Sequence, residues 1–204
     1  VALKFAELLY AAGLPGPMLS VLLGQTSEVA EPLVQHPDVE TLAFTGSVAI
    51  GKRIAATAGY KKLVLELGGN DPLIILNDAD LELAVTLAAE GSYRNSGQRC
   101  TAVKRILVED GIAAKFTARF VEKTKEYVCG DPMDEATRVG TVIDEAAAIQ
   151  LETVLREAVT AGARIVIGGE RRGTLLQPTV ITDVPRDCRM VVCESFGPLA
   201  PIVT

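Results

Sequence analysis

Cys100 is the residue whose neighbours best suit it to act as a nucleophile. It falls in the glycine-containing polar stretch 95–101, directly after Arg99. A neighbouring cation and free backbone N–H groups favour the thiolate, which is the nucleophilic form of cysteine. The alternative for any cysteine is a buried and inert thiol. We expect that alternative for the remaining three, Cys129, Cys188 and Cys193.

A second reactive side chain, Glu66, interrupts an otherwise apolar stretch, 62–67, that has the composition of a β-strand. A carboxylate in apolar surroundings is costly to hold in its charged form, which favours exchange of a proton. At the carboxyl end of a strand, where α/β proteins place their sites, Glu66 would act as a general base. The alternative is a carboxylate at the exposed end of the strand, or one paired with a basic residue.

A glycine turn between a predicted strand and a predicted helix contains the third group of candidates, Gly46, Ser47 and Gly51. It comes close to the phosphate-binding pattern G-x-x-x-x-G-K-[ST], but Arg53 stands where that pattern needs a magnesium-binding hydroxyl. A nucleotide-binding phosphotransferase is therefore the weaker interpretation. The glycines permit close approach, and the helix N-terminus after Ser47 can face an anionic pyrophosphate. The alternative is a tight turn without a ligand.

The composition is that of a globular protein and argues against several classes of function. Among 204 residues there are 20 Lys and Arg against 26 Asp and Glu, a formal net charge of −6. This acidic balance argues against nucleic-acid partners, and no apolar run reaches the roughly 18 residues of a membrane span. Four scattered cysteines and one histidine, His36, form no metal-binding pattern. We therefore expect no metal, and free thiols in a reducing cytoplasm.

Apolar patterning and capping residues predict alternating helices and strands. Helices are expected at residues 1–12, 27–34, 47–58, 80–94, 111–128 and 144–161, and strands at 18–23, 39–44, 62–67, 72–76, 105–108, 164–167 and 178–181. Such alternation predicts an α/β fold with largely parallel sheets. The double glycine Gly68-Gly69 lies between two predicted strands and marks a domain boundary.

Five groups of motifs occur in an order and spacing that resemble the aldehyde dehydrogenase superfamily across nearly the whole chain. They are Phe44-Thr45-Gly46-Ser47 with Gly51, Leu65-Glu66-Leu67-Gly68-Gly69, Gly97-Gln98-Arg99-Cys100, the group 130–132 with 139–140 and 143–144, and Glu194-Ser195-Phe196-Gly197-Pro198. Members of this superfamily oxidise aldehydes with NAD or NADP through a cysteine thioester. The resemblance therefore implies an aldehyde dehydrogenase-like α/β fold, a nicotinamide dinucleotide cofactor and a small-molecule aldehyde substrate.

The resemblance also implies a role for each residue that matches a family motif. Cys100 would add to the aldehyde carbon, with its own N–H as one donor to the oxyanion, and Glu66 would activate water to hydrolyse the thioester. The implied cofactor-binding residues are Gly46, Ser47 and Gly51 at the pyrophosphate, and Leu67, Glu194 and Phe196 at the nicotinamide end. Two positions depart from the common pattern, because Asn70 replaces a lysine and Cys193 replaces a glutamate. We expect only a packing role for Cys193.

Members of the superfamily run to more than twice this length, so the resemblance implies a partial sequence. Residues 1–67 would be the C-terminal part of an NAD(P)-binding, Rossmann-like domain, and residues 68–204 a C-terminally incomplete catalytic domain. We expect the isolated 204-residue chain to be inactive, and the full-length protein to form a homo-dimer or homo-tetramer. A non-catalytic fragment or binding scaffold of the same fold is the alternative.

The stretch Gly97–Arg105 most resembles the branches that act on phosphonoacetaldehyde and, without phosphorylation, on glyceraldehyde 3-phosphate. The residues Asn70-Asp71-Pro72 tip the resemblance toward the first branch. A guanidinium at Arg99 can hold a phosphonate, phosphate or carboxylate in a forked geometry. We therefore expect an anionic aldehyde bound by Arg99. The alternatives for Arg99 are a role in tuning the thiol and a structural ion pair.

Overall fold

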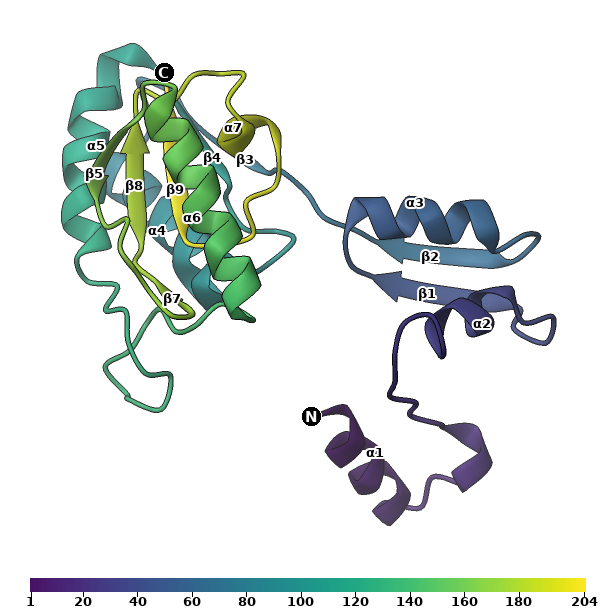
Figure 1. Ribbon diagram of the computed structural model, residues 1–204. Helices are drawn as coiled ribbons and strands as arrows, with labels where there is room; N and C mark the ends of the chain where they lie inside the picture. Colours follow the sequence, from purple (N-terminus) through teal and green to yellow (C-terminus); the bar gives the residue numbers. More distant parts are fainter. The chain divides into compact units, whose positions relative to one another are not determined.

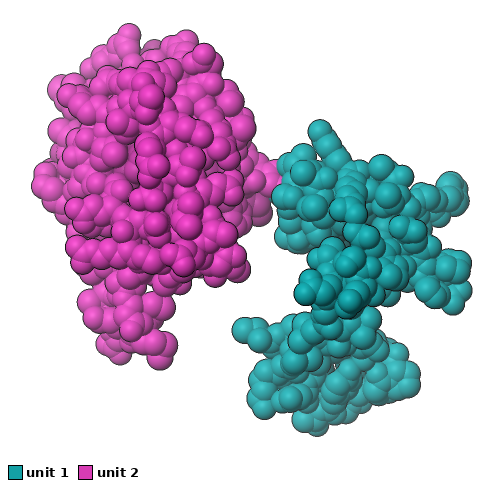
Figure 2. Space-filling view, viewed as in Figure 1, with its two compact units in different colours: residues 1–67 teal, residues 68–204 magenta.

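The computed structural model describes all residues, 1–204, and divides them into two compact units. Unit 1 is Val1–Leu67 and unit 2 is Gly68–Thr204, drawn in teal and magenta in Figure 2. No helix in either unit is long and apolar enough to cross a membrane. Each unit has its own secondary structure, and each is described below by itself.

Unit 1 is built on two parallel strands (Figure 1). Its elements are α1 (Ala2–Ala11), the short 3-10 helix η1 (Gly16–Met18), α2 (Ala30–Gln35), β1 (Thr41–Thr45), α3 (Val48–Thr57) and β2 (Lys62–Glu66). In the β1–β2 register Thr45 lies opposite Glu66, so both strands end at the same edge. The Ser47 hydroxyl accepts a hydrogen bond from the Ile50 N–H at 3.4 Å, which confirms Ser47 as the N-cap of α3.

Unit 2 contains a five-stranded sheet in the order β3-β4-β9-β8-β5. Its strands and helices are β3 (Pro72–Ile75), α4 (Leu81–Tyr93), η2 (Arg94–Gly97), β4 (Arg105–Val108), α5 (Asp110–Thr124), α6 (Glu145–Thr160), β5 (Arg164–Ile167), β6 (Arg171–Arg172), β7 (Leu175–Leu176), β8 (Thr179–Thr182), α7 (Arg189–Val192) and β9 (Leu199–Val203). Four of the five strands run parallel, which confirms the predicted α/β class, and β5 pairs antiparallel with β8 at one edge.

The central strands of unit 2 bury both faces, because successive side chains of a strand point to opposite sides. On β9, Ala200 and Ile202 join the core formed with α4 and α5, whereas Leu199 and Val203 join the core formed with α6 and α7. Figure 1 shows α5 and α6 on opposite sides of the sheet. This two-sided burial makes β9 the centre of the unit and fixes the loop that precedes it.

Three aromatic rings form the middle of the core between α4 and α5. Tyr93 stacks on Phe120 with a centroid distance of 5.9 Å, and Phe120 stacks on Phe116 at 5.4 Å. The Tyr93 hydroxyl hydrogen-bonds the Thr124 hydroxyl at 3.2 Å, and burial raises the pKa of Tyr93. The cluster holds the C-terminal end of α4 in place, directly before the segment that carries Cys100.

Two strand predictions were wrong. The strand expected at residues 18–23 is absent, since no other strand of unit 1 lies beside it to complete a hydrogen-bonded ladder. The strand β9 was not predicted; its Pro201 lacks the N–H that a central strand normally donates. The structure accommodates this proline by pairing β9 with β4 only at Ile202 and Val203.

Replacing the central ring of the aromatic cluster should destabilise unit 2. Phe120 is fully buried, so Phe120→Ala should lower the free energy of unfolding by about 3–5 kcal/mol. Leu87→Ala on α4 is the matched control, since Leu87 is exposed and should change stability by less than about 0.5–1 kcal/mol. Urea denaturation monitored by circular dichroism measures both. Equal losses in the two variants would contradict the assignment of this core.

Candidate active site

The segment that leads to Cys100 is a left-handed turn of three residues. Asn95 and Ser96 both have φ of 55° and Gly97 has φ of 70°, directly after α4 ends. A Cβ on Gly97 would stand 2.2 Å from the carbonyl oxygen of Gly197, so only glycine fits there. The backbone of the turn therefore lies directly against the backbone that precedes β9. Cys100 follows in the same loop with an exposed thiol. Residues 95–102 together are called the Cys100 turn below.

Gln98 holds the turn against a third segment of unit 2. Its Nε2 donates to the carbonyl oxygen of Thr141 at 3.2 Å, and its Oε1 accepts from the Ile143 N–H at 2.8 Å. The Ser96 hydroxyl adds a bond to the Gly140 carbonyl at 3.0 Å. The motifs at 97–100, 139–144 and 194–198 are thus brought together, although they are distant in sequence. In the sequence Gln98 is only one residue of the motif 97–100. Its contacts in the structure show that it positions the turn.

A buried lysine lies beneath the Cys100 turn. Lys104 has only 2% of its surface exposed, and its Nζ donates to the carbonyl oxygens of Arg99, Cys100 and Ala102 at 2.9, 2.8 and 3.3 Å. The same Nζ lies 3.5 Å from a carboxylate oxygen of Glu194. A buried ammonium requires such a set of partners, since an unpaired charge would be strongly disfavoured. Sequence reasoning gave Lys104 no part in the site.

Glu194 is held from a second side by the double glycine at the start of unit 2. The Gly69 N–H donates to its Oε1 at 3.4 Å. A Cβ on Gly68 would stand 1.9 Å from Oε2, so the carboxylate occupies the space that any other residue would fill. Gly69 also packs near the Cys100 carbonyl oxygen, 3.3 Å from the position of a Cβ. The sequence analysis assigned Gly68-Gly69 only to a domain boundary. The structure shows that the two glycines also let Glu194 and the Cys100 carbonyl oxygen come close to the backbone.

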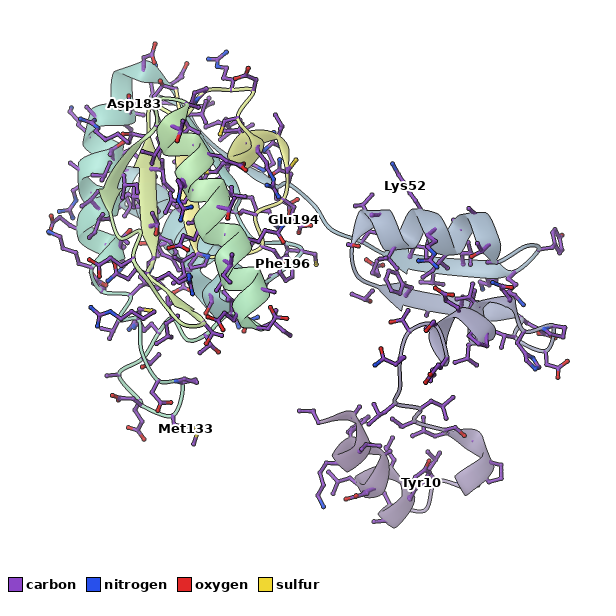
Figure 3. All side chains as sticks on the ribbon, in the orientation of Figure 1. Tyr10, Lys52, Met133, Asp183, Glu194 and Phe196 are labelled. Carbon is purple, nitrogen blue, oxygen red and sulfur yellow. The ribbon has the colours of Figure 1, made fainter.

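A pocket of roughly 250 Å³ opens beside Glu194. Phe196, which has φ of 50° and is 45% exposed, lines it together with Gln98, Gln150 and Ser195. Figure 3 shows Glu194 and Phe196 near each other on the connection between α7 and β9. The Ser195 hydroxyl is buried without a hydrogen-bond partner in the protein. A ligand with hydroxyl groups would find the Glu194 carboxylate as an acceptor in this pocket.

The Arg99 guanidinium is turned away from the role of a substrate anchor. Its Nη2 donates to the carbonyl oxygens of Glu90 and Gly91 at 3.2 and 3.0 Å, in the last turn of α4. Both carbonyl oxygens also accept a backbone N–H group, from Arg94 and from Val103, and the helix dipole favours a cation at this end. The structure thus favours a structural role for Arg99, although with backbone carbonyls rather than the ion pair considered in the sequence analysis.

The other cysteines differ from Cys100 in their surroundings. Cys188 is buried in the core beside α6, and burial raises the pKa of the half-buried Cys129 thiol. The buried position expected for Cys193 was wrong, because Cys193 is exposed and lines the pocket beside Glu194. Only Cys100 lies in the turn fixed by Gly97, Gln98 and Lys104.

In unit 1, Glu66 is the last residue of β2, and its side chain is exposed. Within this unit Glu66 therefore lies at the exposed end of the strand, as the alternative interpretation expected, since the two-stranded sheet leaves that end uncovered. Its carbonyl oxygen accepts from the Gly46 N–H at 3.0 Å, which closes the turn into α3. A Cβ on Gly51 would stand 2.4 Å from the Leu67 side chain, so this glycine lets α3 pack on the end of β2.

An apolar groove of roughly 500 Å³ lies between α2, β1 and α3 of unit 1 and runs along α3 from Ile50 to Thr57. Leu33, Phe44 and Ile50 line it, and Arg53 forms an ion pair with Glu31 at its rim. The Lys52 side chain points away from β1 and β2 (Figure 3). This lysine therefore does not occupy the position of a phosphate-binding lysine, and the structure gives no support to a triphosphate-binding loop.

A comparison with family models finds one match, to the aldehyde dehydrogenase family, over residues 1–204. The chain belongs to the aldehyde dehydrogenase family. It is 41% identical over 196 residues to the sulfoacetaldehyde dehydrogenase of Neptuniibacter caesariensis, covering 96% of this chain and 43% of that protein. It is 42% identical over 207 residues to the mitochondrial succinate-semialdehyde dehydrogenase of Arabidopsis thaliana, covering 99% of this chain and 39% of that protein.

A solved crystal structure has the same fold as this chain. The crystal structure of an NADP-dependent enzyme from E. coli matches with a TM-score of 0.96 and 39% identity, covering 99% of this chain and 43% of that one. The chain therefore spans less than half the length of the family members it matches. The fold expected from the resemblance is confirmed.

Replacing Gly97 should lower the free energy of unfolding more than replacing Gly140 does. Gly97→Ala places a methyl group against the Gly197 carbonyl at a positive φ, so it should lower the free energy of unfolding by about 2 kcal/mol or more. Gly140→Ala is the control, since its Cβ would meet Pro132 at an ordinary 3.4 Å. Thermal unfolding of both variants measures the difference. A Gly97→Ala variant as stable as Gly140→Ala would contradict the close approach.

Proposed function

We propose that the protein oxidises an aldehyde to its carboxylic acid with NAD or NADP as hydride acceptor. The observation that carries the proposal is the exposed Cys100 thiol on a turn that is otherwise rigidly held, in a chain of the aldehyde dehydrogenase family. A nucleophile needs exposure to substrate and a fixed orientation at once. Unit 2 provides both, and we assign it the catalytic role.

Each unit offers groups that fit part of a nicotinamide dinucleotide. In unit 1 the N-terminus of α3, with Gly46 and Ser47, presents backbone N–H groups suited to a pyrophosphate, and the adjoining apolar groove suits a planar base. In unit 2 the Glu194 carboxylate suits the hydroxyl groups of a ribose, with Phe196 beside it. We assign unit 1 to the dinucleotide-binding domain, and the Leu67 carbonyl to the nicotinamide amide. The E. coli structure of an NADP-dependent enzyme supports this assignment.

The first chemical step belongs to Cys100. Its thiolate attacks the aldehyde carbon, a C–S bond forms, and the carbonyl electron pair moves to the oxygen to give a thiohemiacetal oxyanion. The Cys100 N–H is one donor to that oxyanion, and such donors are typically worth about 100- to 1,000-fold in rate. Lys104 bonds the Cys100 carbonyl oxygen and so restricts rotation of this residue. A bound dinucleotide would supply the acceptor for the hydride that leaves this carbon; the carbonyl double bond would then re-form, and Cys100 would carry a thioester.

The second chemical step belongs to Glu66. Its carboxylate takes a proton from water, the hydroxide oxygen adds to the thioester carbon, and the C–S bond breaks to release the carboxylic acid and the Cys100 thiolate. The exposed side chain at the end of β2 is free to serve as a base, since no hydrogen bond or ion pair within the chain engages its carboxylate. A carboxylate already paired with a cation would be a poorer base.

We propose an anionic aldehyde as the substrate class. Two relatives support it, because sulfoacetaldehyde carries a sulfonate and succinate semialdehyde a carboxylate. We assign Arg99 to holding the Cys100 turn rather than to binding the anion, and its bonds to the Glu90 and Gly91 carbonyl oxygens support this assignment.

Removing the nucleophile tests the proposed function directly. Cys100→Ala in the intact protein should abolish NAD(P)-dependent oxidation of succinate semialdehyde or sulfoacetaldehyde, followed as absorbance of the reduced dinucleotide. Cys129→Ala is the matched control, since that thiol lies outside the turn and its loss should leave turnover within about twofold. Oxidation that survives Cys100→Ala would refute the assignment. A wild-type protein without any aldehyde oxidation would favour a non-catalytic scaffold.

Glu66→Gln should separate the two chemical steps. The amide keeps the shape of the side chain but cannot take a proton from water, so thioester hydrolysis should slow by about 100-fold or more. The first turnover should still produce a burst of reduced dinucleotide, measured by stopped-flow absorbance. A burst that disappears in a folded Glu66→Gln variant would instead assign Glu66 to activation of the thiol.

A further inference from the structure

Lys104 is the one buried charge that touches two parts of the proposed site at once. Its three N–H groups face four acceptors, namely three carbonyl oxygens of the Cys100 turn and the carboxylate of Glu194. The carbonyls belong to a segment beside α4, and Glu194 follows α7, 90 positions further along the chain. No other side chain forms polar contacts with both the Cys100 turn and Glu194.

The side chain is not needed to start strand β4, which begins at the next residue. The Lys104 N–H already donates to the Asp71 carbonyl oxygen at 3.0 Å, and this bond starts the pairing of β4 with β3. All three carbonyl partners of the ammonium lie instead in the turn 99–102. The ammonium therefore acts on the turn and on Glu194 rather than on the sheet.

We propose that Lys104 is a positioning residue that holds the Cys100 turn and the Glu194 carboxylate as one unit, so that a dinucleotide ribose bound at Glu194 also sets the orientation of Cys100. Four acceptors share three N–H groups, so any ligand that engages Glu194 changes how the ammonium is shared with the turn. Thermodynamic linkage is reciprocal. The factor by which a bound dinucleotide shifts the conformational equilibrium of the turn is the factor by which a change in the turn alters dinucleotide affinity. The second half of this inference rests on the proposed dinucleotide role of Glu194, whereas the first half does not.

The first arm of the test needs no dinucleotide. Hydrogen exchange followed by mass spectrometry on the intact protein should show faster exchange in Lys104→Met for peptides covering 98–104 and 191–196, by roughly fivefold or more. Glu194→Gln, whose side chain is partly exposed and whose shape is kept, should speed exchange in 98–104 as well. Lys123→Met is the matched control, since it removes a lysine from the surface of α5 and should change neither peptide.

The second arm measures the dissociation constant of NADH and NADPH by fluorescence titration. Lys104→Met should weaken binding by roughly tenfold, in line with the loss of one charge-assisted hydrogen bond. In the Glu194→Gln background the same substitution should change affinity by less than about twofold, because the lysine acts through that carboxylate. Equal losses in both backgrounds would overturn the linkage, because Lys104 would then not act through Glu194.

The two arms separate failure of this inference from failure of the proposed function. Exchange that rises in 98–104 but not in 191–196 would overturn the joint role of Lys104. If Lys104→Met does not fold, unchanged exchange of 98–104 in Glu194→Gln overturns it equally. A wild-type protein that binds neither NADH nor NADPH would refute the dinucleotide role of Glu194, and the exchange arm would still decide whether Lys104 joins the two segments.

Discussion

The close approach of two glycine backbones, Gly97 and Gly197, is the constraint on which the geometry of unit 2 depends. Gly97 has a positive φ and no room for a side chain, because the Gly197 carbonyl oxygen fills the space. Gly197 in turn packs against Leu151 of α6, where a Cβ would stand 2.4 Å from the leucine side chain. The Cys100 turn therefore packs against the segment that precedes β9, and this segment packs against α6. A side chain at Gly97 would meet the Gly197 backbone, and one at Gly197 would meet the Leu151 side chain.

The buried charge at Lys104 completes what the glycines begin. Close backbone contact brings the turn near the loop that precedes β9, and the turn leaves the Cys100 and Ala102 carbonyl oxygens without a backbone donor. The Lys104 ammonium satisfies both, also bonds the Arg99 carbonyl oxygen, and is itself balanced by Glu194. A rigid backbone turn with one exposed thiol is the arrangement that a nucleophile requires, since orientation is then fixed before substrate binds. The aldehyde dehydrogenase fold provides this arrangement within residues 68–204.

Local signals in the sequence predicted much of the fold. Ser47, Asp80 and Asp144 cap the helices that were expected to begin there, and each side chain accepts a hydrogen bond from a backbone N–H of the first turn. The misses came from long-range pairing. The apolar stretch 18–23 lacks a partner strand, and β9 is a central strand in spite of Pro201. The contact between Lys104 and Glu194 depends on tertiary packing, so no local pattern in the sequence predicts it. Glu66 and Arg99 show the same limit. The exposure of Glu66 and the bond of Arg99 to the end of α4 follow from surroundings that local sequence does not specify.

The measurement that tests the account most directly is mass spectrometry of the trapped acyl enzyme. The intact protein would be mixed with succinate semialdehyde and oxidised dinucleotide, quenched in acid within one turnover and digested. The account predicts a succinyl thioester on the peptide that contains Cys100 and unmodified thiols at Cys129, Cys188 and Cys193. Turnover without an adduct on Cys100, or an acyl group found on another cysteine, would contradict it.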